Sequence, residues 1–406
     1  MVSTPDTAHE ARPVLVLVGV LTFAAALVAQ FATQGVALFL RADEASSGLI
    51  GLLYIAAIPY TLRFLWSPLV DRNRLGSAGR YAGWITWSQA AACLAVASLF
   101  LFPPDVAPIG ILALVSIFMI ALGTQLTAVG GLMAAALPGR QFASGSSVQD
   151  ASSALGGMFL GAFVLYLLAD LGWFAVVWAL LVVAGLGLVF SAIYAPRVDV
   201  EPVAMDRPPI LSHLRVLQTR EARQLFAVTF LVNCAIIIPY AAKSVMLIDA
   251  GFSIADASLY GIVFGNAVGA LAALSSRPFI DRIGPMRFLG TLGILNILGV
   301  AVILFQYQDG FSPVVTVVMV LFANASVFAA FTASRAAIMA LCEQGRQATD
   351  FASFVGLETV LYLVFAGISL AFLDTLGFVA ISLFGGALTA LGLLVVFAGR
   401  KKPQNR

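Results

Sequence analysis

The sequence predicts an all-α membrane protein with twelve transmembrane helices in two pseudosymmetric six-helix bundles. Three observations lead to this prediction: the apolar composition, the series of long apolar runs, and a short motif that occurs twice. Of the 406 residues, 61% are hydrophobic and only 10% are charged, whereas about a quarter of the residues in a soluble domain are charged. The composition therefore excludes an ordinary soluble protein.

Twelve apolar runs follow one another along the chain. Most are long enough to cross a bilayer, which takes about 20 residues at a rise of about 1.5 Å per residue. They lie at 13–40, 47–69, 81–102, 108–137, 147–169, 172–195, 224–249, 258–276, 287–306, 313–341, 348–373 and 376–399. An even number of spans places both ends of the chain on one side of the membrane.

The basic residues indicate which side that is. Of the 22 lysines and arginines, 18 fall in one alternating set of loops and tails. These are Arg12, Arg72, Arg74, Arg80, Arg140, Arg197, Arg207, Arg215, Arg220, Arg223, Arg277, Arg282, Arg287, Arg346, Arg400, Lys401, Lys402 and Arg406. The opposite loops hold Arg41 alone. Because basic loops stay on the cytoplasmic side, we expect both termini in the cytoplasm.

The repeated motif divides the chain into two related halves. Pro68-Leu69-Val70-Asp71-Arg72 and Pro278-Phe279-Ile280-Asp281-Arg282 lie 210 residues apart, and each follows a glycine 17 residues upstream. Residues 196–223 hold four prolines and nine charges, so they are expected to form the linker. The predicted domains are 1–195, an N-terminal six-helix bundle, and 224–406, a C-terminal one. Duplicated bundles with a site between them are typical of secondary transporters.

Several other classes of function have little support in the sequence. Cys93, Cys234 and Cys342 are solitary residues in apolar runs, without metal-ligand or disulfide spacing, so we interpret them as packing residues. Neither histidine lies in an apolar run, so no histidine-based metal site is expected in the membrane. No nucleophile–base cluster suggests an enzyme. We expect no cofactor, no metal and no nucleic-acid partner; the expected partners are the lipid bilayer and a small-molecule substrate.

The run 58–72, Ile-Pro-Tyr-Thr-Leu-Arg-Phe-Leu-Trp-Ser-Pro-Leu-Val-Asp-Arg, resembles the span-two signature of muropeptide permeases within the major facilitator superfamily. The compact 12-span chain is closer in size to the rhizobactin and pyochelin group of siderophore permeases, which share this signature. Thr349-Asp350-Phe351 resembles that group too. The resemblance covers the whole chain in architecture but only about 15 residues in specific motif. It implies an alternating-access transporter of the bacterial inner membrane.

The same resemblance implies a conformational latch between the halves. Asp71 and Asp281 end spans two and eight, and each carboxylate is expected to meet a helix N-terminus in the other half, where free N–H groups favour an anion. By pseudosymmetry Asp71 faces the start of span eleven and Asp281 the start of span five. Arginines complete the predicted network: Arg72, Arg80, Arg282 and Arg287. The alternative is that these charges simply obey the positive-inside rule.

Four ionisable residues lie deeper in the apolar runs. They are Arg63, Lys243, Arg335 and Glu358. Charges at such depth are costly and usually face the bundle interior. Glu358 is the main candidate to carry a proton or contact substrate, and the alternative is an ion pair with Arg335 that only holds spans ten and eleven together. Lys243 has a simpler alternative, in which it snorkels to the outer face.

Polar residues mark further substrate contacts. Gln30, Thr33 and Gln34 share one helical face, and Asn233 and Tyr240 lie one i, i+7 stripe apart in span seven. Thr124 and Gln125 in span four complete the set, because spans one, four, seven and ten line the cavity in the superfamily that this chain resembles. Helix-packing hydrogen bonds are the alternative. The sequence Ser147-Val148-Gln149-Asp150 is interpreted as a capping box that opens span five.

Together these features predict a transporter that imports a siderophore or its iron complex. Because no Walker-type phosphate loop is present, the expected driving force is the proton gradient. The first alternative is a permease for cell-wall muropeptides. An alternative of another class is a membrane sensor or scaffold that transports nothing.

Overall fold

The computed structural model describes residues 7–42, 47–76, 79–104, 106–159, 165–200, 215–306 and 312–398. In this part of the chain all regular secondary structure is helical. The expectation of an all-α protein is therefore confirmed. Residues 201–214 of the expected linker lie outside the described ranges, so the linker and the domain boundaries stay predictions.

The N-terminal half, residues 7–198, begins with a helix that contains one π-helical turn. Its elements are α1 (Thr7–Gln30), η1 (Phe31–Gly35), α2 (Val36–Ala42), α3 (Ser47–Ala56), α4 (Ile58–Thr61), η2 (Leu62–Leu65), α5 (Ser67–Arg72), α6 (Ala82–Ser98), η3 (Leu99–Leu101), α7 (Pro108–Ala136), η4 (Gly139–Gln141), α8 (Phe142–Phe159) and α9 (Leu165–Val198). Helix α9 reverses direction at Gly172, whose φ of 73° suits glycine.

The C-terminal half, residues 215–398, repeats the pattern. Its elements are η6 (Arg215–Gln218), α10 (Arg220–Ala241), α11 (Lys243–Asp249), α12 (Ile254–Ser258), η7 (Leu259–Phe264), α13 (Gly265–Ile283), α14 (Pro285–Gln306), α15 (Pro313–Met339), α16 (Gln347–Ala371) and α17 (Leu373–Ala398). A glycine with positive φ, Gly377, turns the chain inside α17 as Gly172 does inside α9. The two turns lie at corresponding places in the halves.

Ten helices of the described residues are long and apolar enough to cross a membrane. Two expected spans are not among them. The run 47–69 is divided into α3, α4, η2 and α5, because Pro59 and Pro68 cannot donate backbone hydrogen bonds to a continuous helix. The run 147–169 is covered by α8 and the start of α9, and residues 160–164 lie outside the described ranges. Ten of the twelve expected spans thus correspond to such helices in the described residues, and the count of twelve stays a prediction.

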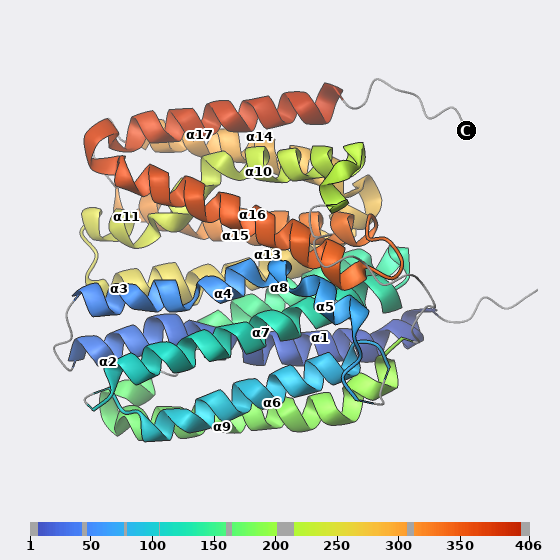
Figure 1. The fold of residues 1–406 in the computed structure, drawn as a ribbon. Helices are drawn as coiled ribbons and strands as arrows, with labels where there is room; N and C mark the ends of the chain where they lie inside the picture. The colour runs from blue at the N-terminus through green and yellow to red at the C-terminus, as the bar shows by residue number, and fades with distance from the viewer. Residues whose placement is uncertain are drawn as a thin grey trace, which may run out of the picture.

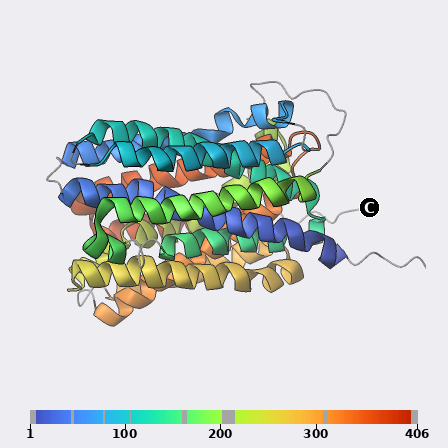
Figure 2. The ribbon, with the colours of Figure 1, turned by 90° about the horizontal axis from the view of Figure 1, so that it is seen from below.

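Each half packs mainly with itself, and the halves meet along a few helices (Figure 1). Helices α1, α6, α7 and α9 pack together on one side, and α10, α14 and α17 on the other. The halves touch where α8 packs against α13 and α15, and where α16 packs against α5, η2 and α7. Figure 2 shows the same rows of nearly parallel helices from below.

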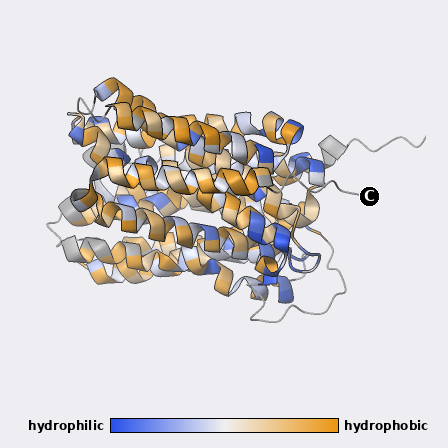
Figure 3. Cartoon of the chain, turned by 90° about the horizontal axis from the view of Figure 1, so that it is seen from above, coloured by the Kyte–Doolittle hydropathy of each residue, from blue (hydrophilic) through white to orange (hydrophobic). Residues whose placement is uncertain are grey.

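The bundle has one strongly polar end. Helix α1 begins and α17 ends there, and Figure 3 shows that hydrophilic residues gather at this end. Arg72, Arg140, Arg197 and Arg282 belong to its loops and helix ends; we call it the basic end. Around the sides, large apolar residues in the middle of helices, such as Leu186 and Leu271, are more than 60% exposed. Such exposure in a helical bundle of this composition indicates a lipid-facing surface.

Candidate functional site

A cavity of about 350 Å³ lies mainly within the N-terminal half, and Leu363 of α16 contributes to its wall from the other half. Its wall comes from the first, second, fourth and fifth spans and from α16. The wall includes Gln30, Thr33, Tyr60, Thr61, Ser153 and Leu363. The wall is mostly apolar with a few hydroxyl and amide groups, which is typical of a small-molecule site.

The polar face predicted on span one reaches this cavity in part. Gln30 and Thr33 line it. Thr33 lies in the π-helical turn η1 and donates its hydroxyl to the Ala29 carbonyl oxygen at 3.1 Å. Gln34 is exposed and donates its Nε2 to Gln30 Oε1 at 3.0 Å. Because π-helical turns are frequent at functional sites, the irregular geometry here favours substrate contact by Gln30 and Thr33.

Arg63 is buried in the broken second span. It lies in the 3₁₀ segment η2, where Nη1 donates to the Tyr60 carbonyl oxygen at 3.2 Å and the guanidinium lies 4.8 Å from the Tyr60 ring centroid. Among the described residues Arg63 has no carboxylate partner within ion-pair distance. Tyr60 lines the cavity, so the guanidinium of Arg63, which has no carboxylate partner among the described residues, lies against a residue of the cavity wall.

The residue next to Arg63 contacts the other half. The Phe64 side chain packs so closely on Gly356 of α16 that a Cβ atom at this glycine would come within 2.5 Å of the ring. Gly356 lies two residues before Glu358 on the same helix. The second span and α16 are therefore in van der Waals contact at the depth of the candidate proton site.

Arg335 forms an ion pair with Asp150, across the interface between α15 and α8. Asp150 also accepts a hydrogen bond from the Thr332 hydroxyl at 3.1 Å, and its side chain is 1% exposed. The capping-box interpretation of Asp150 is wrong, because α8 begins at Phe142. Asp150 therefore lies eight residues, or about 12 Å, inside the helix. The pairing of Arg335 with Glu358 as a fixed brace is also not what the ion-pair geometry shows.

Glu358 is buried on α16 with weak hydrogen-bond partners. Ser334 Oγ lies 3.4 Å from one carboxyl oxygen and Tyr362 Oη lies 3.5 Å from the other. The single Tyr362 hydroxyl proton has a better acceptor in the Thr229 carbonyl oxygen, at 2.7 Å. Arg335 lies within electrostatic range of Glu358. A buried carboxyl group with such poor donors has an environment suited to the neutral form.

Asn233 joins this cluster from α10. Its Nδ2 donates to the Thr229 carbonyl oxygen at 2.7 Å and to Tyr362 Oη at 3.1 Å. Asn233 thus contacts the partner of Glu358 rather than the cavity described above. Tyr362 was not singled out in the sequence, although its position one helical turn after Glu358 is the signal that identifies it.

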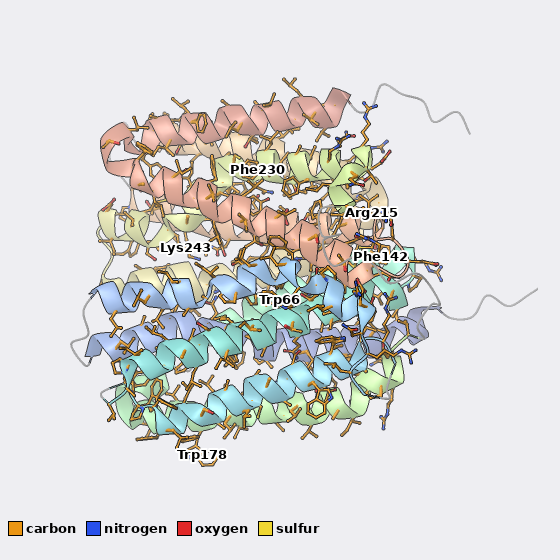
Figure 4. The ribbon with its side chains drawn as sticks, viewed as in Figure 1. Trp66, Phe142, Trp178, Arg215, Phe230 and Lys243 are labelled. Atoms are coloured by element: carbon orange, nitrogen blue, oxygen red, sulfur yellow. The ribbon has the colours of Figure 1, made fainter. Side chains whose placement is uncertain are left out.

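Tyr240 and Lys243 lie together toward the other end of the bundle. Figure 4 shows Lys243 far from Arg215, which marks the basic end. The Lys243 ammonium lies 4.6 Å from the Tyr240 ring centroid and 3.5 Å from Asn324 Oδ1 on α15. Lys243 therefore turns toward a neighbouring helix of its own half. In the described part of the chain it has no ion-pair partner.

Gln125 does not reach the cavity. Its side chain is fully buried, and Nε2 donates to Gln89 Oε1 at 2.7 Å, while Gln89 Nε2 donates to the Ala184 carbonyl oxygen at 2.9 Å. This chain of hydrogen bonds links α7, α6 and α9. The geometry assigns Gln125 to helix packing instead of substrate contact, because the side chain points into its own bundle. Its neighbour Thr124 accepts a hydrogen bond from Trp66 Nε1 at 3.0 Å, which ties span four to the broken span two.

At the basic end, Asp71 meets the start of α16. Its carboxylate accepts hydrogen bonds from the Thr349 backbone N–H and hydroxyl, both at 2.7 Å, and from the Ala348 N–H at 3.3 Å. Arg80 Nη2 lies 3.1 Å from the same carboxylate, and the Tyr81 hydroxyl donates to it at 2.9 Å. The side chain of Asp71 is completely buried. These contacts close the interface between the halves at this end.

Arg80 extends the contact across the interface. It donates to the Gly345 carbonyl oxygen and to Gln347 Oε1 in the other half. Arg72 lies at the end of α5 and is half-buried. Arg80 therefore belongs to the closed network through these contacts, and Arg72 lies close to the same network.

The repeat partner of Asp71 has a different environment. Asp281 is 40% exposed and pairs with Arg277, four residues before it on the same helix, at 3.6 Å. Arg282 is exposed. The expected contact of Asp281 with the start of span five is not present in this conformation, because Asp281 faces outward from α13. Asp71 and Asp281 therefore make different contacts, although the motif is repeated in the sequence. A latch role stays a proposal for both residues.

Asp199, which the sequence did not single out, caps the start of α6. Its carboxylate accepts hydrogen bonds from the backbone N–H groups of Ala82 at 2.6 Å and Tyr81 at 2.9 Å. Burial raises the pKa of Asp199, and these backbone hydrogen bonds oppose the increase. Asp199 thereby fixes the segment that presents Arg80 and Tyr81 to Asp71. Only the folded chain brings these residues together, since 117 residues separate Asp199 from Ala82.

Comparisons with known proteins agree with this architecture. A sequence model described as the Major Facilitator Superfamily matches residues 14–360. The anhydromuropeptide permease of Escherichia coli K12 is 23% identical over 367 residues, which are 87% of this chain and 72% of the permease. An uncharacterised protein of Haemophilus influenzae is 28% identical over 173 residues, which are 42% of this chain and only 40% of that relative's length.

Solved structures share the fold at low sequence identity. A bacterial homologue of the iron transporter ferroportin, in an outward-facing state, has a TM-score of 0.74 and 15% identity, with 97% of this chain and 100% of that chain covered. The fucose:proton symporter of Escherichia coli has a TM-score of 0.68 and 13% identity, with 96% and 98% covered. At these identities the likeness shows the fold alone. Because the family match extends through both halves, the chain belongs to the Major Facilitator Superfamily and is a multi-pass membrane transporter that works by alternating access.

Proposed function

We propose that this transporter imports an organic anion together with protons, and that its basic end faces the cytoplasm. The observation that carries the proposal is Arg63, a buried cation without a carboxylate partner in the described residues, stacked on a tyrosine of the cavity wall. A buried charge is costly unless it is paired. An anionic group on the substrate, held in the cavity, supplies the missing partner.

Two substrate classes fit an anion of this kind. A muropeptide carries peptide carboxylates, and the Escherichia coli relative that aligns over 87% of this chain is an anhydromuropeptide permease. A siderophore or its iron complex remains the second candidate, on the basis of the signature at 58–72. The cavity of about 350 Å³ is near the lower limit for drug-sized ligands, so either solute requires the halves to separate before it enters.

Uptake of labelled solutes distinguishes these candidates. We expect cells that lack their own importers, and that express this chain, to accumulate labelled anhydromuropeptide above the vector control. Arg63→Gln should abolish specific uptake. Arg63→Lys should retain part of it, since a lysine preserves the charge but lacks the planar guanidinium group that can donate two hydrogen bonds to a carboxylate. Arg74→Gln removes the same charge from an exposed loop and serves as the matched control. Accumulation of a siderophore instead selects the second candidate.

A lack of accumulation of either solute would favour the non-transporting sensor or scaffold. Uptake that survives Arg63→Gln at the wild-type level would remove the anion-binding role from Arg63. It would direct attention to Lys243, the other deep cation without an ion-pair partner in the described part.

The proposed orientation has an independent test. A cysteine at position 309, between the ninth and tenth apolar runs of the sequence and outside the described residues, should react with an impermeant maleimide added to intact cells. A cysteine at Arg140, which is exposed at the basic end, should react only after the cells are opened. The native cysteines are replaced first. The reverse labelling pattern contradicts the orientation while leaving the transport proposal intact.

A further inference from the structure

We propose that Arg335 exchanges carboxylate partners between the halves, from Asp150 when Glu358 is protonated to Glu358 when it is ionised. The inference rests on the proposed proton coupling and deepens it. It assigns to Asp150, on α8, a role in coupling proton binding to the separation of the halves.

Charge balance limits how the two buried acids near Arg335 can be compensated. One guanidinium group, on Arg335, has two buried carboxyl groups near it: Asp150, which pairs with it directly, and Glu358, which lies within electrostatic range. Burying a carboxylate is tolerated only when a cation or several good donors compensate it. Arg335 therefore compensates one acid at a time, and the other acid needs a proton or water.

In this conformation Arg335 compensates Asp150. Asp150 has the ion pair and the Thr332 hydroxyl at 3.1 Å. Glu358 has Ser334 Oγ at 3.4 Å, Tyr362 Oη at 3.5 Å and the Thr229 hydroxyl close by, and the tyrosine and threonine hydroxyls donate to the backbone carbonyl oxygens of Thr229 and Phe226. The geometry therefore places the proton on Glu358, which is held as a neutral acid while Arg335 and Asp150 join α15 to α8.

The surroundings of Glu358 contain few other groups that titrate or carry charge. On α15 these are Arg335 and the neutral Ser334, and α10 contributes the neutral Thr229 and Asn233. The same helix supplies Tyr362. From the second span, Arg63 and Tyr60 act electrostatically on Arg335. When Glu358 loses its proton, Arg335, on the neighbouring helix α15, is the cation that interacts with its carboxylate.

The exchange of partners by Arg335 affects the contact between the halves at the basic end of the bundle. Asp150 lies about 12 Å from the start of α8, and that start is at the basic end, where Asp71 closes the interface between the halves. Separation of α8 from α15 at the basic end brings water to Asp150, which can then stay ionised without Arg335. The balance is complete: Glu358 releases one proton to the basic end, Arg335 keeps its charge and moves to Glu358, and Asp150 keeps its charge and becomes hydrated.

The test measures the distance between the halves at the basic end and needs no substrate. Spin labels are attached to cysteines at Arg74 and Gln344, exposed positions in the two halves, in a purified chain whose native cysteines are replaced. In the otherwise wild-type protein the open-to-closed ratio should rise with pH, by up to about tenfold per pH unit, which is the limit for one linked proton. The closed distance should dominate at acidic pH.

The two carboxyl variants should shift this equilibrium in opposite directions. Asp150→Asn leaves Arg335 with Glu358 alone, so the basic end should be open at every pH. Glu358→Gln leaves Arg335 with Asp150 alone, so in the absence of substrate the closed distance should dominate at every pH. Asp150→Glu should restore a pH response. Ser147→Ala, one turn earlier on α8 and also buried, is the control for a conservative change in this helix, and thermal melting checks that each variant is folded.

If the ion pair of Arg335 with Asp150 only holds α15 and α8 together, the variants should behave differently. This structural role predicts that Glu358→Gln behaves as wild type and that Asp150→Asn only lowers the melting temperature. Shifts of both variants in the same direction, or a wild-type pH response in Asp150→Asn, overturn the exchange. Failure of the proposed import is separate, because it appears in the uptake measurement while these distances still change.

Discussion

Glu358→Gln should abolish uphill accumulation of substrate and leave exchange of substrate across the membrane intact. The glutamine is close in shape to the neutral acid that the site holds, so the buried cluster with Tyr362 and Ser334 should stay folded. For one proton per solute, each pH unit across the membrane supplies about 1.4 kcal/mol and a tenfold accumulation ratio. In Glu358→Gln this ratio should fall to about one, measured in proteoliposomes with an imposed pH gradient.

Counterflow in the same proteoliposomes is the control for folding and substrate binding. It requires the halves to alternate around bound substrate but no net proton movement. Normal accumulation with unchanged pH dependence in Glu358→Gln would exclude Glu358 as the coupling residue and leave Asp150 and Asp350 as the acids to examine. Loss of counterflow together with accumulation would instead assign Glu358 to binding or packing.

Asp71→Asn should open the basic end and impair transport while the protein remains folded in the membrane. The asparagine keeps the volume but loses the charge that accepts hydrogen bonds from Thr349, Ala348 and Arg80. A hydrogen bond to a charged group contributes about 1.5–3 kcal/mol. A loss of about 2 kcal/mol shifts the open-to-closed ratio roughly 30-fold, which labelling of a cysteine at Gln347 with a maleimide should detect.

Asp281→Asn is the matched control, because it makes the same chemical change at the equivalent position of the repeat. In this conformation Asp281 is exposed and pairs with Arg277 alone among the described residues, and such a pair contributes little. We therefore expect a small shift in labelling for Asp281→Asn. Equal effects of the two variants would show that Asp281 forms its own contact in another conformation, and no effect of either would dismiss the latch.

Local patterns in the sequence predicted the architecture well, because each depends on one segment. Apolar runs reveal helices irrespective of their neighbours, and the repeat at Asp71 and Asp281 revealed the duplication. Pro59 and Pro68 are the sequence signal for the breaks in the second span. The breaks were not predicted, because the hydropathy of this run is continuous. Those breaks place Arg63 in a 3₁₀ segment beside the cavity.

The site was harder to predict because it depends on which distant helices pack together. Asp150 resembles a capping acid until the true start of α8 is known, and its partner Arg335 lies 185 residues away in the other half. Gln125 is a polar residue of the kind that contacts substrates. Its side chain instead points into its own bundle, because the rotation of α7 against α6 places it there. Asp199 carries no local signal, as its role arises only where the end of α9 meets the start of α6.

The contact of Phe64 with Gly356 has a thermodynamic consequence for the proposed roles of their neighbours. Arg63 and Glu358 are separated by one interface of packed atoms rather than by a long relay, so a displacement of either helix strains the other. Linkage then requires reciprocity: the factor by which a bound anion changes the proton affinity of Glu358 equals the factor by which the proton changes the affinity for the anion. An inserted methyl group at Gly356 would disturb both affinities at once, and the transporter would leak protons or solute without altering either binding group.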